Sequence, residues 1–310
     1  MPKALPQSSG KHSQYLAEYE CEYECEYQCE SNVSDVISEH NSNSNFPNGY
    51  AIVTGGSRGL GFATAAGLID AGISVVIIGK DVERLKTAKQ KLSEQAISAG
   101  SYSNSNKSNE ANSLNNQSVK KVSVESRAVD VADTLKFREV LKEITTTFGV
   151  PKILMLAHGV MSEKMSKTLR TNDEEWRRVL AINLDAVFVA LNQVVPAMAD
   201  ARDGRVVVYS ACLGRMSGPG NAGGLAPYRI SKAGVNALVR NLAHETGMGA
   251  RGLLVDAICP NHSRTDMGGP DAPRSAEEGA QTAIWLATRN FEPGKDQTGL
   301  LWEDQQVVPW

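Results

Sequence analysis

From Tyr50 onward, short apolar runs that are typical of buried strands alternate with longer amphipathic runs that are typical of helices. This alternation predicts βαβ units, in which parallel strands are covered by helices on both faces. We therefore expect an α/β fold built on a doubly wound parallel sheet, in one domain of residues 47–310. The expected strands are Tyr50–Thr54, Ser74–Gly79, Lys121–Val129, Ile153–Ala157, Arg205–Ser210 and Leu253–Ile258, with a short final strand near Gly299–Leu301.

Two polar segments lie outside this pattern. Met1–Phe46 is polar and repetitive, with too few apolar residues to offset the entropy lost on ordering, so we predict a disordered tail over residues 1–46. Ser98–Ser118 consists almost wholly of Ser, Asn, Gly and other polar residues. This low-complexity insertion, residues 98–118, is predicted to loop out between the second helix and the third strand.

The charges nearly balance, with 32 Lys and Arg against 35 Asp and Glu, so no strong field favours nucleic acid or an anionic membrane as a partner. The first residues lack the apolar stretch of a secretory signal, and we expect no later run of uninterrupted apolar residues to be long enough to span a bilayer. We therefore expect a cytoplasmic protein whose partner is a small molecule, with no nucleic acid and no membrane.

The cysteines fall into two groups. Cys21, Cys25 and Cys29 have a four-residue spacing that could place three thiols on one helix face, but the paired CxxC spacing of structural zinc sites is missing. A low-complexity repeat is the favoured interpretation, so no metal is predicted, and a metal-binding regulator is the alternative. Cys212 and Cys259 lie in apolar runs and are interpreted as small buried hydrophobic residues.

A glycine-rich turn follows the first expected strand. Thr54–Gly61 reads TGGSRGLG and precedes a helical pattern, which is the context that a dinucleotide-binding turn requires. Glycines let the backbone turn tightly and approach a pyrophosphate, whose charge is met by amide N–H groups at the helix N-terminus. The sheet is therefore expected to be of Rossmann type. The residues predicted to bind the cofactor here are Gly55, Ser57, Arg58, Gly59, Leu60 and Gly61.

The residues after the second strand bear on which dinucleotide is bound. Where an NAD-binding sequence has an acidic residue for the ribose 2′-hydroxyl, this chain reads Ile78-Gly79-Lys80-Asp81. Lys80 and Arg58 could instead hold a 2′-phosphate, so NADP(H) is favoured over NAD(H). The alternative is that Lys80 is a solvated cation and that Asp81 caps the next helix, and the closeness of Asp81 keeps NADH open.

Tyr228 and Lys232 lie four residues apart in a run with helical periodicity, YRISKAGVNALVRNLA, and so share one helix face. A tyrosine keeps its proton to about pH 10 unless a nearby cation stabilises the phenolate, which a lysine one turn away can do. The pair alone is a common amphipathic pattern. Its position after the fifth strand of a dinucleotide-binding fold is what favours a catalytic role.

These motifs, in this order and spacing, resemble the short-chain dehydrogenase/reductase family. The resemblance covers roughly Tyr50–Trp310 and rests on TGGSRGLG, on Asp130-Val131 after the third strand, on Asn183 in NLDAVF, on the strand end with Ser210, and on YRISK. The segment RTDMGGPDAPRSAEEGAQTAIWLAT further resembles the carbonyl-reductase branch. This resemblance implies NADPH as cofactor and a small-molecule carbonyl compound or alcohol as substrate.

The resemblance also implies a role for each matching residue. Tyr228 would donate its phenolic proton to the carbonyl oxygen as hydride arrives from the nicotinamide. Lys232 would lower the pKa of Tyr228 and hold the nicotinamide ribose, and Asn183 would support a proton-relay water next to Lys232. Further cofactor contacts would come from Asp130 and Val131 at the adenine, Gly159 after the fourth strand and Thr265 at the nicotinamide carboxamide. Taken singly, Asn183 has an alternative as a helix breaker, and Asp130 and Thr265 as caps.

Three departures from the family pattern bear on catalysis. The family usually has two serines at the end of the fifth strand, where this chain has Ser210 and then Ala211 in the catalytic place. Ser210 is a candidate catalytic residue, but neighbouring strand residues point to opposite faces, so it substitutes only if the strand bulges or turns. His158 stands in LAHG where the family has NNAG, and is interpreted as a packing residue. Asn261 replaces a family glycine and tolerates a positive φ.

The leading prediction is therefore an NADPH-dependent oxidoreductase that reduces a ketone or aldehyde to an alcohol, or runs the reverse reaction. The alternative is an NADP(H)-binding sensor or scaffold of the same fold with little or no turnover, for which Ala211 is the main argument. Restoring serine at Ala211 distinguishes the two. The sequence leaves open the substrate, the direction of reaction, and the choice between a monomer and a homo-oligomer.

Overall fold

The computed structural model describes residues 49–105, 122–163, 166–218, 222–292 and 295–310, all within one compact unit, Ser44–Trp310. The predicted tail, residues 1–46 with its three cysteines, lies outside the described residues. Residues 106–118 of the predicted insertion lie outside them as well.

The described strands form one sheet. The strands are β1 Tyr50–Thr54, β2 Ser74–Gly79, β3 Val124–Ala128, β4 Ile153–Leu156, β5 Gly204–Tyr209, β6 Leu253–Ile258, β7 Leu301–Glu303 and β8 Gln306–Val308. Their order in the sheet is β3-β2-β1-β4-β5-β6-β7-β8, and only β7 and β8 pair antiparallel. The chain winds outward in one direction from β1 and in the other from β4, which confirms the predicted doubly wound sheet.

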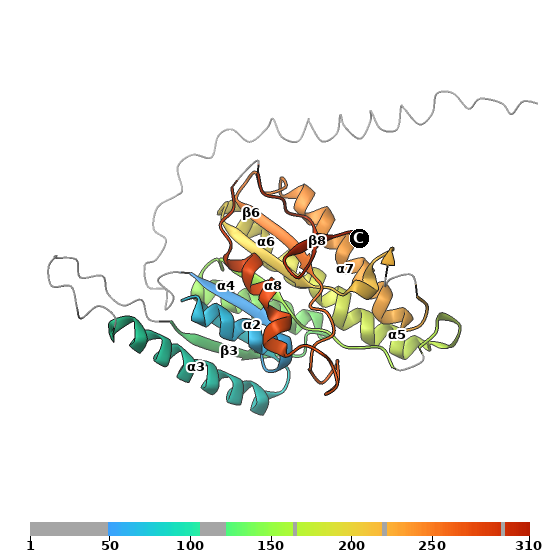
Figure 1. Cartoon of the computed structure of the whole chain (residues 1–310), viewed down its shortest axis with the longest axis horizontal. Coiled ribbons are helices and arrows are strands. Elements are labelled where there is room, and N and C mark those ends of the chain that lie inside the picture. The colour runs from blue at the N-terminus through green and yellow to red at the C-terminus, as the bar shows by residue number, and fades with distance from the viewer. Residues whose placement is uncertain (1–48, 106–121, 164–165, 219–221, 293–294) are drawn as a thin grey trace, which may run out of the picture. The chain divides into compact units, whose positions relative to one another are not determined.

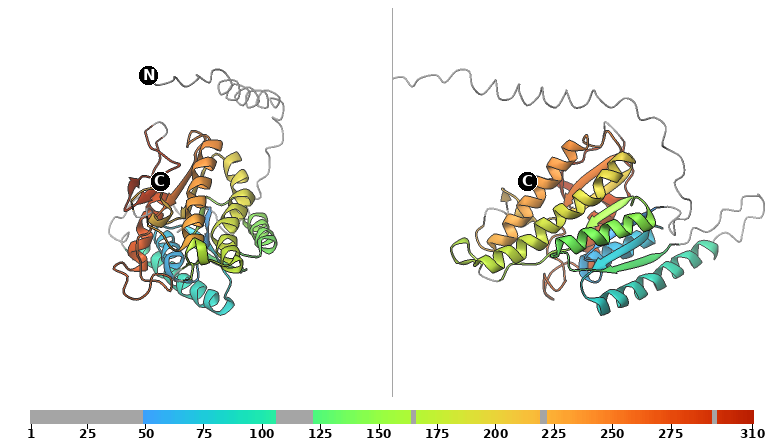
Figure 2. Two further views of the ribbon diagram at one scale, coloured as in Figure 1. Left: turned by 90° about the vertical axis from the view of Figure 1, so that its right-hand side faces the viewer. Right: turned by 180° about the vertical axis from the view of Figure 1, so that it is seen from behind.

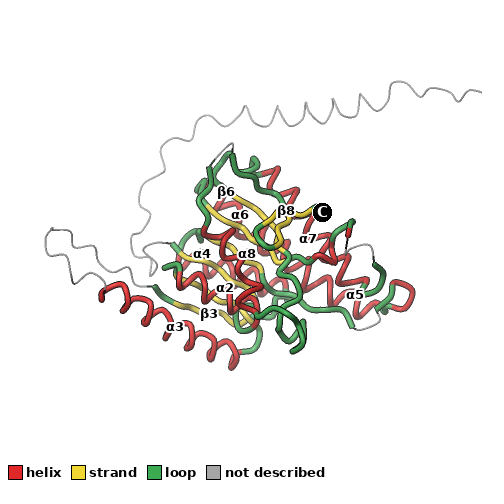
Figure 3. The backbone as a smooth tube through the Cα atoms, viewed as in Figure 1, coloured by secondary structure: helices red, strands yellow, loops and turns green. Residues whose placement is uncertain are grey.

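Helices cover both faces of this sheet. The helices are α2 Gly59–Asp70, α3 Val82–Ser105, α4 Thr134–Phe148, α5 Asp173–Leu180, α6 Ala186–Asp200, α7 Ala226–Glu245 and α8 Ala276–Thr288, and the short turns are η1 Thr168–Arg170, η2 Ala181–Asp185 and η3 Cys212–Gly214. One face packs against α2, α3 and α8, and the other against α4, α6 and α7 (Figures 1 and 2). The strands lie between the two helical layers (Figure 3).

Each face of the sheet has its own apolar core, because successive side chains of a strand point to opposite sides. In β1, Ile52 packs in the core formed with α4, α6 and α7, whereas Ala51 and Val53 pack in the core formed with α2, α3 and α8. All residues of β1 are buried. This burial on both faces explains why the central strands are continuous apolar runs in the sequence.

The two edge strands differ most from the prediction. β3 is shorter than the expected run, and only Val124 of its residues is buried, because an edge strand is covered less completely. β8 was not predicted. It follows β7 through Asp304 and Gln305, whose φ angles are 51° and 59°. Such a two-residue hairpin favours Asn or Asp followed by Gly, so Asp304 fits the turn but Gln305 stands where glycine is preferred, and the turn signal is weak.

Helix α3 extends into the segment that was predicted to loop out. It continues to Ser105, so the prediction was wrong for residues 98–105. The hydroxyl of Ser98 donates a hydrogen bond to the carbonyl of Glu94 at 3.0 Å. Once a helix is nucleated, each added residue gains a backbone hydrogen bond for little further ordering, so polar residues can extend it.

One helical run, Asp173–Asp200, is long and apolar enough to cross a membrane by length and composition, contrary to the sequence expectation. It comprises α5, η2 and α6, and half of its most apolar stretch is buried within the protein. Its buried side includes Val187, Ala190 and Val194, which pack in the core beside α4. A core helix passes the same test, so the cytoplasmic location stays a prediction.

Candidate active site

A cavity of about 520 Å³ lies at the carboxyl ends of the strands, where the strand order reverses between β1 and β4. This is the position at which open α/β sheets bind their ligands. Every residue that the sequence predicts to bind the cofactor, apart from the Tyr228 and Lys232 pair, lines this cavity. These residues are Gly55, Ser57, Arg58, Gly59, Leu60, Gly61, Lys80, Asp130, Val131, Gly159 and Thr265.

Glycines shape the turn between β1 and α2. Gly55 and Gly59 have φ angles of 67° and 54°, which other residues rarely adopt. A Cβ at Gly61 would lie 2.3 Å from the carbonyl oxygen of Gly55, so the backbone segments touch there. The N-cap residue Arg58 makes no side-chain cap, which leaves the first N–H groups of α2 for an anion. A cofactor pyrophosphate fits this turn.

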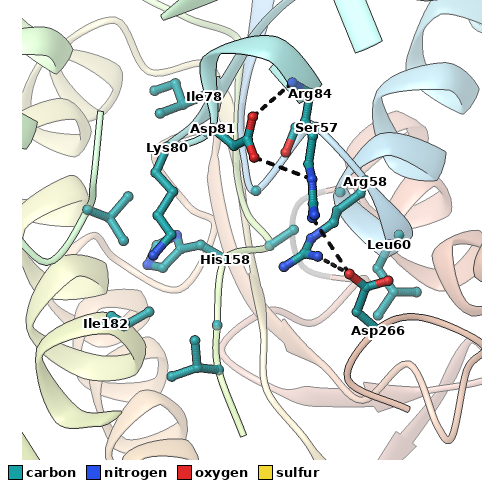
Figure 4. A pocket seen from close by; sticks show the side chains of 18 of the residues that line it. Ser57, Arg58, Leu60, Ile78, Lys80, Asp81, Arg84, His158, Ile182 and Asp266 are labelled. Atoms are coloured by element: carbon teal, nitrogen blue, oxygen red, sulfur yellow. Dashed lines mark hydrogen bonds and ion pairs between the residues drawn. The ribbon is translucent and has the colours of Figure 1, made fainter. Parts of the chain in front are cut away.

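Three basic side chains stand around the cavity, and two of them share one carboxylate (Figure 4). Arg58 forms an ion pair with Asp266, and Arg84 lies 3.8 Å from the same group. Sequence analysis missed Arg84 and Asp266. Arg84 carried a signal, since it lies in the first turn of a predicted helix, but Asp266 is 208 residues from Arg58 and carried none.

Asp81 is committed to the start of α3. Its Oδ1 accepts a hydrogen bond from the backbone N–H of Arg84 at 3.0 Å, and its Oδ2 lies 3.3 Å from Nε of the same residue. This is the capping alternative considered for the sequence. Lys80 lies 3.8 Å from Asp130 and is mostly exposed. An NAD-binding protein of this fold has an acidic residue after the second strand for the ribose 2′-hydroxyl. Asp81 is the nearest such residue here, and its carboxylate already caps α3.

His158 is buried at the end of β4. Its Nδ1 lies 2.6 Å from Oγ1 of Thr54, which also accepts the backbone N–H of Ala157 at 3.1 Å. Its ring packs edge-on against Phe137. Burial, with the charge of Lys232, lowers the pKa of His158 to about 3, so the ring is neutral near pH 7. This geometry fits the packing interpretation rather than a proton carrier.

Asn183 joins the chain after β4 to helix α7. It lies in η2, a π-type turn between α5 and α6, so the helix is widened there rather than broken. Its Oδ1 accepts the N–H of Val160 at 2.8 Å, and its Nδ2 donates to the carbonyl of Val160 at 2.9 Å and to Oγ of Ser231 at 3.1 Å. One lone pair of Oδ1 remains for a water, so the relay role stays a prediction.

Tyr228 and Lys232 lie one turn apart on α7, and both are almost fully buried, with 5% and 4% of their surface exposed. Nζ of Lys232 lies 5.9 Å from the ring centroid of Tyr228 and donates a hydrogen bond to the carbonyl of Tyr209 at 2.6 Å. The backbone N–H of Tyr228 donates to Oγ of Ser162 at 2.9 Å, which fixes the start of α7 against the loop after β4.

Burial determines the protonation of this pair. It raises the pKa of Tyr228 above its ordinary value, with a smaller contribution from the nearby Cys259 and Cys212, and it lowers the pKa of Lys232 to about 8. Desolvation of the phenol dominates here, and the Lys232 ammonium donates to the Tyr209 carbonyl, so the lowering of the Tyr228 pKa by Lys232 stays a prediction. Near pH 7, Tyr228 holds its proton.

Gly159 connects the cavity to the buried pair. It lines the cavity, and a Cβ built on it would lie 3.4 Å from Oδ1 of Asn183 and 3.6 Å from Nζ of Lys232. The cavity wall at Gly159 therefore lies within van der Waals range of both side chains. A ligand that fills it up to Gly159 has the Lys232 ammonium beside it.

The hydroxyl of Ser210 does not face Tyr228 or the Lys232 ammonium. Its Oγ donates a hydrogen bond to Oδ1 of Asn236 and lies 3.3 Å from the carbonyl of Lys232, both on α7. Its backbone N–H continues the ladder to β6 without a bulge, by donating to the carbonyl of Ile258 at 2.8 Å. Its hydroxyl is thus committed to α7, which argues against the predicted catalytic role and leaves Ala211 without a substitute there.

The remaining predicted residues combine two roles. Oδ1 of Asp130 accepts the N–H of Ala132 at 3.1 Å, and Oγ1 of Thr265 accepts the N–H of Gly268 at 3.1 Å, so both residues act as caps while lining the cavity. Asn261 has a φ of 58°, which fits its place at a family glycine.

Cys259 is buried as expected from the sequence, and Cys212 differs from that expectation. Cys212 lies in η3 and is only partly buried. The backbone N–H of Cys212 donates a hydrogen bond to Sγ of Cys259 at 3.1 Å. The apolar run around Cys212 gave no sign of this, because the turn after β5 brings it back toward the end of β6.

Comparisons with known proteins agree with this geometry. The family model for enoyl-(acyl carrier protein) reductase matches residues 85–293. The 3-oxoacyl-[acyl-carrier-protein] reductase FabG of Escherichia coli is 31% identical over 223 residues, which are 72% of this chain and 77% of that protein. The FabG of Staphylococcus epidermidis is 29% identical over 71% of this chain and 77% of its own length.

Among solved structures, a short chain dehydrogenase from Salmonella enterica serovar Typhi matches the fold with a TM-score of 0.66. It is 19% identical and is matched over 84% of this chain and 96% of its own. The ordered motifs, the doubly wound sheet and the sequence relatives lead to one assignment. The chain belongs to the short-chain dehydrogenase/reductase family of oxidoreductases.

Proposed function

We propose that this protein uses NADPH to reduce a ketone or aldehyde carbonyl to an alcohol, or catalyses the reverse oxidation. One observation carries the proposal: the cavity formed by the glycine-rich turn is also lined by Gly159, which lies beside Nζ of Lys232. A dinucleotide that filled the cavity would therefore bring its reactive end to the helix that carries Tyr228.

The residues fit a nicotinamide dinucleotide. Gly55 and Gly61 let backbone segments approach so closely that a Cβ at either would meet neighbouring backbone, and α2 starts at this tight turn with uncapped N–H groups that can bind a pyrophosphate. When bound, the reduced cofactor would supply the hydride. Asp130, Val131 and Thr265 would hold its adenine and carboxamide ends, as the family resemblance implies.

Tyr228 would provide the proton. Because burial raises its pKa, it is a phenol near pH 7 and can protonate the alkoxide that forms as hydride reaches the carbonyl carbon. Lys232 would stabilise the phenolate left behind, once its ammonium turns from the carbonyl of Tyr209. Asn183 would act as a positioning residue, since it ties Val160 to α7 through Ser231.

The charges around the cavity favour NADPH over NADH. Lys80, Arg58 and Arg84 stand on its lining, and Asp81 is occupied as the cap of α3. A 2′-phosphate would compete with Asp266 for the two guanidinium groups and would gain charge-assisted hydrogen bonds. A ribose 2′-hydroxyl would find the Asp81 carboxylate already engaged.

Titration of the full chain with NADPH and with NADH, followed by cofactor fluorescence, tests this preference. Arg84→Ala is expected to weaken NADPH binding about tenfold and to leave NADH binding nearly unchanged, because only NADPH carries the 2′-phosphate. Arg240→Ala, an exposed position on α7, is the matched control. Equal losses for both cofactors with Arg84→Ala, or tighter binding of NADH by the wild type, would contradict the preference.

The substrate class is tested with a panel of aldehydes, ketones, quinones and 3-oxoacyl thioesters, while the absorbance of NADPH is followed. The thioesters belong in the panel because the named relatives are 3-oxoacyl-[acyl-carrier-protein] reductases. Loss of absorbance that depends on one member supports reduction of that carbonyl class.

A second candidate is an NADP(H)-binding protein with little turnover. The observation that favours it is the pairing of Ser210 with Asn236, which leaves no serine hydroxyl at the place of Ala211. Binding of NADPH without turnover across the whole panel would favour this function over the first.

A further inference from the structure

Two cysteines meet where β5 and β6 end. The strands pair in parallel with Tyr209 opposite Ile258, so the residues that follow them stay close together. The backbone N–H of Cys212 donates to Sγ of Cys259 at 3.1 Å, so the Cys259 sulfur lies against the backbone of Cys212. These are the cysteines within the part of the chain that the structure describes.

The two thiols are unequal in access and in charge. Cys259 is 2% exposed, whereas Cys212 reaches the surface. The neighbouring Cys259 thiol lowers the pKa of Cys212 to about 6, against the opposing effects of burial and of the charge of Glu303. The Cys212 thiol and burial raise the pKa of Cys259. The accessible member is thus the one that forms a thiolate more readily.

The pair lies beside the buried Tyr228 and Lys232. Both cysteines lie close enough to contribute to the raised pKa of Tyr228, and Cys259 acts on the pKa of Lys232 in the same direction, against the larger effect of burial. The turn that carries Cys212 is packed tightly on α7. A Cβ at Gly214 would lie 2.7 Å from the backbone carbonyl carbon of Lys232, so η3 has no room to move without displacing that helix turn.

We propose that Cys212 and Cys259 form an oxidation site for hydroperoxides, in which Cys212 is the attacking thiolate and Cys259 the resolving thiol, and that the product is a disulfide between them. An accessible thiolate next to a second thiol is the arrangement that reversible thiol oxidation requires. Disulfides in cytosolic proteins are usually transient and redox-sensing, which fits a pair that is reduced in this structure.

The reaction has two steps. The Cys212 thiolate attacks one peroxide oxygen, so an S–O bond forms, the O–O bond breaks, and the leaving hydroxide takes a proton to become water. Cys212 is now a sulfenic acid, oxidised by the electron pair that the peroxide accepted. The Cys259 sulfur then attacks the Cys212 sulfur. The S–S bond forms as the S–O bond breaks, and the hydroxyl leaves as water with the thiol proton.

Disulfide formation would alter the neighbouring site. It would bring the two sulfur atoms to about 2.0 Å from each other and so pull η3 toward the end of β6. It would also remove the thiolate charge beside Tyr228. If the proposed reductase function holds, on which this part rests, oxidation lowers turnover by roughly tenfold to a hundredfold, the range that a displacement of about 1 Å near the reacting atoms produces.

The test uses the full chain with Cys21, Cys25 and Cys29 replaced by serine, so that the pair provides the only thiols. The protein is treated with a slight excess of hydrogen peroxide, digested and analysed by mass spectrometry. The expected product is a peptide linked through Cys212 and Cys259 that dithiothreitol separates. Two free thiols after treatment, or irreversible oxidation of Cys212 without a linked peptide, would overturn the proposal.

Two variants identify the roles of the thiols. Cys259→Ser should stop the reaction at the sulfenic acid of Cys212, which dimedone labels. Cys212→Ser should leave Cys259 unlabelled, because that thiol is buried and protonated. Labelling of Cys259 in the second variant, or none of Cys212 in the first, would reverse or remove the assigned order. These readouts need no turnover, so they stand whether or not the reductase assay succeeds.

Turnover with NADPH is then compared before oxidation, after oxidation and after dithiothreitol. A reversible fall that Cys212→Ser abolishes supports the coupling to Tyr228. A disulfide that forms with unchanged turnover would refute the coupling, and absence of turnover in the reduced protein would count against the proposed function alone.

Discussion

Nζ of Lys232 donates a hydrogen bond to the backbone carbonyl of Tyr209 at 2.6 Å. The ammonium is thereby held at the end of β5, 5.9 Å from the ring of Tyr228, and both side chains are buried. The lysine is thus positioned by the sheet as well as by its own helix. Its positive charge lies beside the tyrosine, where it can stabilise a phenolate when cofactor and substrate are bound.

Replacing Lys232 tests whether its positive charge contributes to proton transfer. Lys232→Met keeps the length and apolar stem of the side chain but removes the cation that would stabilise the phenolate, so turnover is expected to fall about a hundredfold or more. Steady-state rates with NADPH and a responsive carbonyl substrate measure the effect. Arg240→Met, an exposed position on the same helix, is the control. A loss of less than about threefold for Lys232→Met would show that the ammonium has no part in proton transfer.

Gly159 provides a graded test of where the cofactor lies. Because a Cβ would lie 3.4 Å from Asn183 and 3.6 Å from Lys232, Gly159→Ala should fit with ordinary contacts. Gly159→Val adds two methyl groups at the cavity wall and should weaken NADPH binding about tenfold or more. Fluorescence titration measures both variants, and thermal melting verifies that each is folded. Equal affinities for the two would mean that the cofactor does not reach Gly159.

His158 should make stability depend on pH. Its folded pKa of about 3 lies below the unfolded value of about 6.5, so the unfolded state binds more protons between these values. The stability is fully present above about pH 6.5 and falls as the pH drops toward 3. From about pH 7 to about pH 5 the loss is about 2 kcal/mol, and His158→Ala should lack it.

Urea unfolding at the two pH values measures this difference. Other titrating groups contribute equally to the wild type and the variant. The two proteins are therefore compared by how much their free energy of unfolding changes between the two pH values. His244→Ala, an exposed position, is the control. An equal change in the free energy of unfolding for His158→Ala and the wild type would contradict a buried, neutral His158 ring.

The sequence predicted those parts of the fold that rest on burial from both sides. The bounds of β1, β2 and β6 were predicted to the residue, since a strand covered by helices on both faces is a continuous apolar run. The β7 to β8 hairpin was missed because Gln305 takes the position where such a turn prefers glycine, so Asp304 alone gives only a weak turn signal. The length of α3 was missed because polar residues extend a helix that is already nucleated.

The sequence predicted which residues form the candidate site, but it did not predict which side chains contact each other there. Spacing placed Tyr228 and Lys232 on one face of α7, and the glycine-rich turn placed the cavity. No local pattern could show that Arg58 pairs with Asp266 or that Cys212 meets Cys259, because these contacts depend on how distant loops meet above the sheet. The hydrogen bond of Ser210 to Asn236 likewise depends on the packing of α7 on β5.

Ala211 offers the most direct gain of function. Ala211→Ser restores a hydroxyl at the place where the family usually has one, and Ser210 remains tied to Asn236. If the wild type lacks a donor for the carbonyl oxygen, the rate should rise about tenfold to a hundredfold, with NADPH affinity unchanged. The same absorbance assay measures it. A rate that stays the same or falls would show that the wild-type site already supplies that donor by other means.

The central claim is that Tyr228 protonates a carbonyl substrate in an NADPH-dependent reduction, and one comparison tests it most directly. Wild type and Tyr228→Phe are titrated with NADPH by fluorescence and then assayed against the carbonyl panel by NADPH absorbance. The account predicts equal NADPH affinity and a rate for Tyr228→Phe that is lower by about a hundredfold or more. Turnover that survives in Tyr228→Phe would contradict the account, as would a wild type that fails to bind NADPH.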